Sequence, residues 1–187
     1  MPTNILWTGR EYYSLEHCLI DEGKEATEIS ATIIGYYEGK IYQVTYRIQT
    51  NRHWQTTYFH SDSRFNGRAQ QVLLESDGQG NWLRDGKAAT AFDGCLDLDL
   101  PLTPLTNTLP IRRLQLTPGQ AQEIKVIYCD LLADEIKPVR QKYTCRSPGA
   151  YHYQNIPNDF EATISVDNAG LVIDYPGLFL RTAMIKS

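Results

Sequence analysis

Apolar and polar residues alternate with a period of two along most of this 187-residue chain. The clearest case is YQVTYRIQ (42–49), in which Tyr, Val and Ile alternate with Gln, Thr and Arg. Successive side chains of a β-strand point to opposite faces, so this pattern predicts a strand with one buried and one wet face. Twelve Tyr and three Trp, with little helical periodicity, favour the same reading. The sequence therefore predicts an all-β protein.

Short turn sequences separate the alternating segments at spacings that suit antiparallel hairpins. They are YEGK (37–40), SDGQGN (76–81), RDGK (84–87) and DNAG (167–170). We expect one hairpin from 42–49 and 54–58, and a second from 160–166 and 171–175. A meander is the simplest topology for such a series. Helix is expected only as single turns, at 117–123 and within LLADEIKPV (131–139), where Pro138 would end it.

A dozen or so curved strands cannot stay a flat, open sheet, because sheets twist and long exposed edges invite aggregation. We therefore expect a barrel, half-barrel or sandwich formed by one domain over residues 1–187, a length that suits a single core. A barrel of this size holds one small ligand when side chains do not fill its interior.

Charge and cysteine usage exclude several classes of function. The net charge is −4 and there is no long basic run, so nucleic acid is not an expected partner. The sequence shows neither a signal peptide nor a transmembrane segment, which predicts a soluble, cytoplasmic protein. The four cysteines form no CxxC pair, so we expect free thiols, no metal and no cofactor.

The most unusual segment is GCLDLDLPLTPLTNTLPIRRL (94–114). We expect a strand over 95–100 with Asp97 and Asp99 on one face, a Pro-bounded polar loop, and a second strand that contains Arg112 and Arg113. The two acids are interpreted as a solvated strand face, as partners for an arginine, or as a glycosidase pair, since residues two apart on a strand lie about 7 Å apart.

The two arginines fall on opposite faces of the expected second strand, so one of them points inward whichever face is buried. A buried guanidinium needs a partner, and Asp97 or Asp99 is nearest in sequence. The alternatives are a structural clasp and a site that holds a phosphate, carboxylate or sugar hydroxyl. Thr106 and Asn107 in the loop either make local turns or recognise hydroxyl groups.

No catalytic nucleophile emerges elsewhere in the chain. The four histidines are scattered, and there is no GxSxG motif. SDGQGN lacks the lysine and the following helix of a phosphate loop. Tyr151 and Tyr153 are either core residues or a stacking platform for a sugar.

The segment 94–114, followed by YHYQ (151–154) and FEATISVDNAGLVIDYPGLFLR (160–181), resembles the bacterial family named "putative glycolipid-binding proteins". YQVTYRI and DGQGNW match too, in the same order, so the resemblance covers nearly the whole chain. It implies a strongly curved, unclosed antiparallel barrel or β-roll that resembles lipoprotein carriers of the LolA type. It supplies no functional residues to transfer.

The leading hypothesis is a non-enzymatic binding protein for a glycolipid or similar amphiphile. Its acyl chain would occupy the barrel concavity, and its polar head would lie at the segment 94–114. A carbohydrate-active hydrolase and an interaction domain with a filled core are the alternatives, and a homodimer is left open. The candidate ligand-binding residues are Asp97, Asp99, Thr106, Asn107, Arg112, Arg113, Tyr153 and Tyr175.

Overall fold

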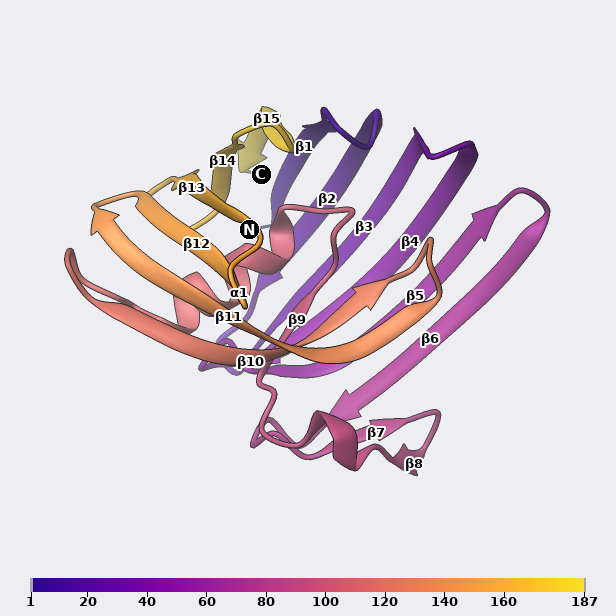
Figure 1. Cartoon of the computed structure of the whole chain (residues 1–187), viewed down its shortest axis with the longest axis horizontal. Coiled ribbons are helices and arrows are strands. Elements are labelled where there is room, and N and C mark those ends of the chain that lie inside the picture. The colour runs from indigo at the N-terminus through magenta and orange to yellow at the C-terminus, as the bar shows by residue number, and fades with distance from the viewer. Residues whose placement is uncertain (1, 187) are drawn as a thin grey trace.

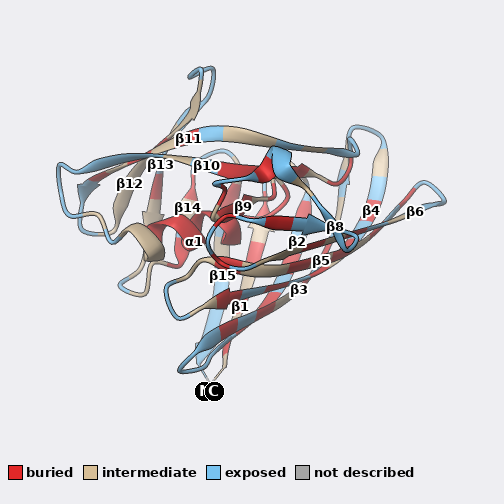
Figure 2. Cartoon of the chain, turned by 90° about the horizontal axis from the view of Figure 1, so that it is seen from below, coloured by how far each residue is buried: buried red, intermediate tan, exposed pale blue. Residues whose placement is uncertain are grey.

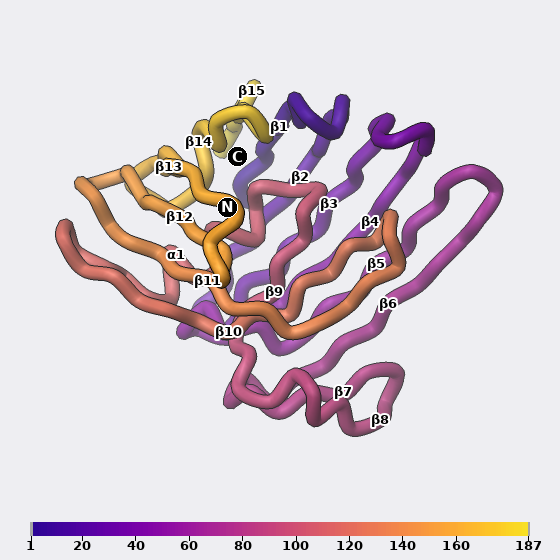
Figure 3. Tube along the Cα trace, in the orientation of Figure 1, coloured from indigo at the N-terminus to yellow at the C-terminus, as the bar shows by residue number. Residues whose placement is uncertain are grey.

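Fifteen β-strands form one sheet that curls into an unclosed barrel (Figures 1 and 3). The computed structural model describes residues 2–186. The strands are β1 Thr3–Gly9, β2 Ser14–Glu22, β3 Ala26–Tyr37, β4 Lys40–Asn51, β5 Thr56–Phe65, β6 Arg68–Ser76, β7 Trp82–Arg84, β8 Lys87–Ala88, β9 Asp97–Asp99, β10 Ala121–Asp130, β11 Glu135–Ser147, β12 Ala150–Ile156, β13 Glu161–Val166, β14 Val172–Tyr175 and β15 Phe179–Lys186. The short helices are η1 Thr90–Phe92 and α1 Leu105–Leu114.

The two ends of the chain meet in the middle of the sheet. Strand β1 pairs with β15, with Thr3 opposite Lys186, and one antiparallel meander runs outward from each of these two strands. The free edges, β8 and β9, therefore follow one another in the sequence, and β9 pairs in parallel with β10. The sheet consequently has an opening along its edges, which confirms the expected unclosed all-β barrel.

Side chains bridge the gap that backbone pairing leaves. Lys40 on β4 donates from Nζ to the carbonyl oxygen of Leu132 in the β10–β11 turn at 2.8 Å. Gln70 on β6 donates to Asp134 of the same turn at 2.5 Å. The β10–β11 hairpin accordingly arches across the first meander, as Figure 1 shows.

The expected hairpins are confirmed, and the second expected helical turn is wrong. Strand β4 pairs with β5, β13 pairs with β14, and all four turn sequences connect neighbouring strands. At 117–123 the chain turns only as far as Gln120, because β10 begins at Ala121. Residues 131–134 form a hairpin turn, and Pro138 lies within β11 opposite Ile127. The pairing of β11 with β10 outweighs the helical tendency of LLADEI.

The segment 94–114 runs through the barrel instead of along its surface. The expected polar loop is wrong from Leu105 onward, and so is the expected second strand: Leu105–Leu114 form α1, which lies with β9 inside the curled sheet (Figures 1 and 2). Seven consecutive helix residues, 105–111, are buried. Leu105 and Leu109 pack in one hydrophobic cluster and Ile111 in the other, so the helix joins the two parts of the core.

A helix suits this position although its residues are poor helix formers. A chain that crosses the interior away from the sheet must pair its own backbone groups, and a helix does so locally. The Thr103 hydroxyl accepts a hydrogen bond from the Leu105 backbone at 3.0 Å, near the helix start. The helix ends at Gln115, which has φ +48° and donates to the Ile111 carbonyl oxygen at 3.3 Å.

An ion pair fastens α1 to β9. Arg113 Nη2 lies 2.6 Å from Asp97 Oδ2, and Arg113 Nε is 3.2 Å from both carboxylate oxygens. The Asp97 side chain is completely buried, so the interpretation of this acid as part of a solvated face is wrong. Burial raises the pKa of Asp97, and the Arg113 guanidinium opposes that rise.

Arg112 points to the opposite end of the barrel from the α1 N-terminus. Its two terminal nitrogens donate to the Glu22 carboxylate at 2.8 and 2.9 Å, and its guanidinium lies 3.9 Å from the centre of the Trp54 ring. Each arginine is therefore paired with a carboxylate of this chain.

Loss of the buried pair is expected to destabilise the protein far more than loss of the exposed one. Asp97→Asn leaves Arg113 without a counter-charge, which costs about 3 kcal/mol in the free energy of unfolding. Glu22→Gln is the matched control and costs less than about 1 kcal/mol, since the Arg112 pair is partly solvated and the Trp54 contact remains. Urea denaturation measures both; equal losses would contradict the clasp.

Candidate functional site

A cavity of about 290 Å³ lies at one end of the barrel, called here the mouth pocket. This end carries the turns 10–13, 38–39, 66–67, 131–134, 157–160 and 176–178. Both meanders and the segment that precedes α1 contribute to the walls. The lining residues are Glu11, Tyr12, Asp99, Leu100, Pro101, Thr103, Asn107, Tyr128, Tyr153, Asn155, Phe160, Tyr175, Leu178 and Phe179.

Aromatic rings form most of the pocket wall. The ring centre of Tyr153 lies 6.2 Å from that of Tyr175 and 6.1 Å from that of Phe160, in edge-on or tilted arrangements. On the other side, Tyr12 stacks on Phe179 with 5.7 Å between ring centres. These contacts fix the ring positions, because each ring packs against a neighbour contributed by another strand or turn.

Four phenol hydroxyls around the pocket have no hydrogen-bond partner among residues 2–186. They belong to Tyr12, Tyr128, Tyr153 and Tyr175. Burial raises the pKa of each, so each stays a neutral hydroxyl that both donates and accepts. None of the four oxygens is among the buried side-chain atoms of residues 2–186 that lack a partner, so these hydroxyls reach the open space of the pocket and are available to a polar ligand or to water.

The polar floor of the pocket comes from β9 and the start of α1. Asp99 accepts a hydrogen bond from Gln141 Nε2 at 2.6 Å, and burial raises its pKa to about 6. Asn107 accepts a hydrogen bond from the Tyr143 hydroxyl at 2.9 Å through its Oδ1. At neutral pH the floor therefore presents one carboxylate and one oriented amide.

A buried carboxyl group supports the floor from below. The Tyr46 hydroxyl donates to Glu16 Oε1 at 2.5 Å and lies 3.4 Å from the hydroxyl of Thr103, which lines the pocket. Burial raises the pKa of Glu16 to about 7, and Glu16 Oε2 has no partner among the described residues. This network joins β2 and β4 to the segment that leads into α1.

The structure brings together half of the candidate residues named from the sequence. Asp99, Asn107, Tyr153 and Tyr175 line the mouth pocket. The other four candidates lie elsewhere: Asp97 and Arg113 pair in the interior, Arg112 lies at the far end, and Thr106 accepts a hydrogen bond from the Leu100 backbone at 3.2 Å. A ligand-binding role for any of the eight stays a prediction.

Sequence reasoning missed three residues of the pocket wall. They are Tyr12 in the β1–β2 turn, Thr103 between β9 and α1, and Tyr128 near the end of β10. The usable signal in the sequence was a tyrosine beside a turn at the end of a strand. Whether such a residue points into the barrel mouth can be predicted only when the strand direction and the sheet curvature are known.

Asp97 and Asp99 do not share a cavity. Asp97 is buried and forms an ion pair with Arg113, whereas Asp99 lines the mouth pocket. An acid pair that cleaves a glycoside must flank one bond, and this arrangement does not provide that. Within residues 2–186 no group of three or more His, Cys, Asp or Glu side chains is arranged to hold a metal ion.

An open β-barrel with an internal helix and a small phenol-rich pocket at its mouth defines the structural class of this protein. The chain belongs to the family described as "Putative glycolipid-binding", whose sequence profile matches residues 4–181. It is also similar to the crystal structure of a DUF1089 family protein from Pseudomonas aeruginosa. The two are 37% identical, with a TM-score of 0.79 over 89% of this chain and 91% of the other. No curated protein matches the sequence.

No helix within residues 2–186 is long and apolar enough to cross a lipid bilayer. The expected likeness to carriers of the LolA type stays a prediction.

The buried Glu16 is expected to make stability depend on pH. Its pKa is higher in the folded protein than in the unfolded chain, so the stabilisation is fully present below about pH 4.5 and is lost as pH rises through 7. Glu16→Gln keeps an acceptor for Tyr46 and removes the titration. The variant should be about 3 kcal/mol more stable than the parent at pH 9, with little difference at pH 4.

Urea denaturation at several pH values measures this difference. Asp99 titrates with the same sign, but it does so in both proteins and largely cancels in the comparison. A difference that does not change with pH would contradict the assignment to Glu16.

Proposed function

We propose that this protein binds a glycolipid without chemical conversion and holds the sugar headgroup in the mouth pocket. The observation that carries the proposal is the set of four unpartnered phenol hydroxyls around one carboxylate and one amide. The family description supports the same ligand class.

The chemistry of the pocket suits a sugar ring. Carboxylate and amide groups such as Asp99 and Asn107 exchange hydrogen bonds with adjacent hydroxyls, and charge-assisted bonds are the stronger ones. The faces of aromatic rings pack against the C–H groups of a sugar. Ligand pockets combine apolar walls with a few fixed polar groups in this way.

The charge of the pocket favours a neutral sugar over an anionic head. Its lining contains two carboxylates, Glu11 and Asp99, and no Lys, Arg or His. The two arginines that the sequence offered as anion ligands are already paired with Asp97 and Glu22. A phosphate in the mouth pocket would meet repulsion without a compensating cation.

The size of the pocket limits what enters it. A volume of about 290 Å³ is at the lower end of ligand pockets, which suits a single sugar residue. The sequence hypothesis placed the acyl chain in the barrel concavity, but leucines of β9, of α1 and of the segment between them occupy that space. Leu98, Leu100, Leu105 and Leu109 are all buried there. We therefore place the lipid chains outside the barrel.

A cytoplasmic location is part of the same proposal. All four cysteines are buried free thiols, which suits a reducing compartment.

Saturation-transfer NMR with soluble methyl glycosides tests the headgroup assignment. We expect at least one of methyl glucoside, galactoside and mannoside to bind, and glucose 1-phosphate to bind more weakly. Asp99→Asn should weaken binding about tenfold, because it replaces a charge-assisted hydrogen bond with a neutral one. Asp21→Asn, an exposed aspartate on β2, is the control.

Two outcomes would contradict the proposal. One is binding of none of the glycosides by protein that is folded by circular dichroism. The other is equal affinity in the parent and Asp99→Asn.

A further inference from the structure

An apolar strip lies on the outside of the barrel next to its mouth. Its members are Tyr13, Leu15, Ile34, Tyr36 and Ile41, and all are exposed; Tyr13 and Ile41 are each 75% exposed. Leu15 pairs across strands with Ile34, and Tyr36 pairs with Ile41, so the residues adjoin on β2, β3 and β4. Adjoining exposed apolar side chains of this kind mark an interaction surface.

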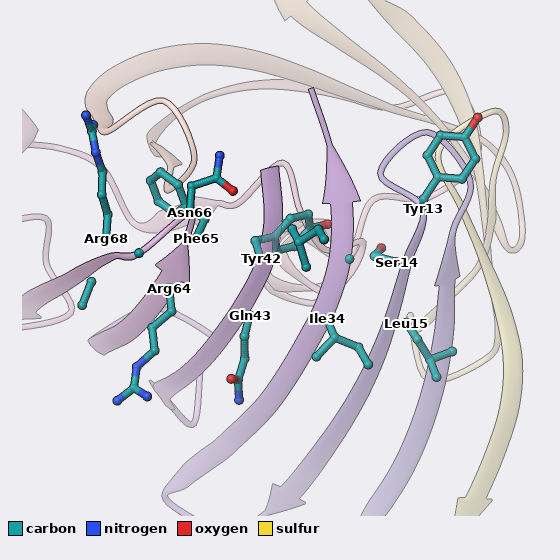
Figure 4. Close-up of a pocket in the computed structure, with 14 residues that line it drawn as sticks. Tyr13, Ser14, Leu15, Ile34, Tyr42, Gln43, Arg64, Phe65, Asn66 and Arg68 are labelled. Carbon is teal, nitrogen blue, oxygen red and sulfur yellow. The ribbon is translucent and has the colours of Figure 1, made fainter. Parts of the chain in front are cut away.

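An unpaired arginine extends the strip. The cross-strand row continues from Ile34 through Gln43 to Arg64, whereas Arg68 is paired with Phe65 and lies on the opposite face of the sheet. Figure 4 shows Leu15, Ile34, Gln43 and Arg64 projecting to the same side of the sheet. Arg64 has no carboxylate partner among residues 2–186, unlike Arg112 and Arg113.

The strip and Arg64 border one open hollow of about 880 Å³ at the ends of β2 to β6. An acyl chain lying in it would keep one side in water, because the hollow is open. A lipid bilayer, in contrast, would cover the apolar side chains and bring anionic headgroups to Arg64. Tyrosine is favoured at such an interface, and each nearby arginine adds attraction to anionic lipid.

We propose that this strip docks the protein on the surface of an anionic lipid bilayer. The apolar side chains enter the interface, and Arg64 contacts the anionic headgroups. This docking is a property of the outer face and needs no ligand in the mouth pocket.

The apolar strip lies next to the mouth pocket, which connects membrane docking with headgroup binding. This connection rests on the proposed function. Tyr12 lines the mouth pocket, while the next residue, Tyr13, belongs to the strip. The neighbours Tyr36 and Tyr37 are divided in the same way. The ring centre of Tyr37 lies 4.7 Å from that of Tyr12, whereas Tyr36 is exposed and belongs to the strip. Docking through the strip thus places the pocket beside the bilayer, where the headgroup of a glycolipid stands.

Co-sedimentation with glycolipid-free vesicles tests the proposal. We expect the full chain to bind vesicles of phosphatidylglycerol and phosphatidylcholine, and to bind pure phosphatidylcholine much more weakly. The double variant Tyr13→Ser with Ile41→Ser should lose at least tenfold in vesicle affinity. Arg64→Gln should lose about fivefold, and added salt should reduce the binding of the parent.

Ile185→Ser is the matched control, because Ile185 is an exposed strand isoleucine, 66% exposed, near the other end of the barrel. It should bind vesicles like the parent protein. Asp99→Asn should also keep vesicle binding, and the double strip variant should keep glycoside binding. Failure of docking is thereby distinguished from failure of the proposed headgroup site.

Two results would overturn the proposal. The first is that the parent binds no vesicle, or that the strip variants bind as well as the parent. The second is a dimer in analytical ultracentrifugation that the double strip variant dissociates, since the strip would then be the contact between two copies of the chain.

Discussion

Burial of the segment 94–114 inside the curled sheet is the interaction on which the rest of the structure depends. The sheet is not closed by backbone pairing, so its concave face would be open to water without a filling. Leucines of β9 and α1 cover that face, and the Asp97–Arg113 ion pair fixes the helix in place. Because this segment fills the concave side of the sheet, the mouth pocket is confined to the space above its N-terminal end.

The buried segment also determines where the two arginines lie. Arg113 pairs with Asp97 in the interior, and Arg112 pairs with Glu22 at the far end of the barrel, so neither reaches the mouth pocket. The pocket is left with carboxylates and phenols, which favours a neutral, hydroxyl-rich group over an anion. Arg64, which has no carboxylate partner among residues 2–186, is outside, next to exposed apolar residues. The proposed headgroup site and the proposed bilayer-facing surface are thus next to each other at one rim of the barrel.

Much of the fold and half of the candidate site were predictable from the sequence. Alternation at 42–49 and turn sequences such as DNAG specify strands and hairpins locally, and those predictions are confirmed. Asp99 and Asn107 were identified because polar residues in an apolar segment are unusual. The helix was missed because Thr, Asn and Pro disfavour helix in isolation, and burial on all sides outweighed that preference. Tyr12 was missed because its direction depends on sheet curvature.

The sequence by itself determined the all-β class, the hairpins, the family and the importance of the segment 94–114. These follow from side-chain periodicity and turn chemistry, which act between residues close in the chain. Only the tertiary structure decided that the segment fills the barrel, that Asp97 and Asp99 have different surroundings, and that phenols from both meanders surround one pocket. Those outcomes depend on the β1–β15 pairing and on strand curvature, which bring together residues more than a hundred positions apart.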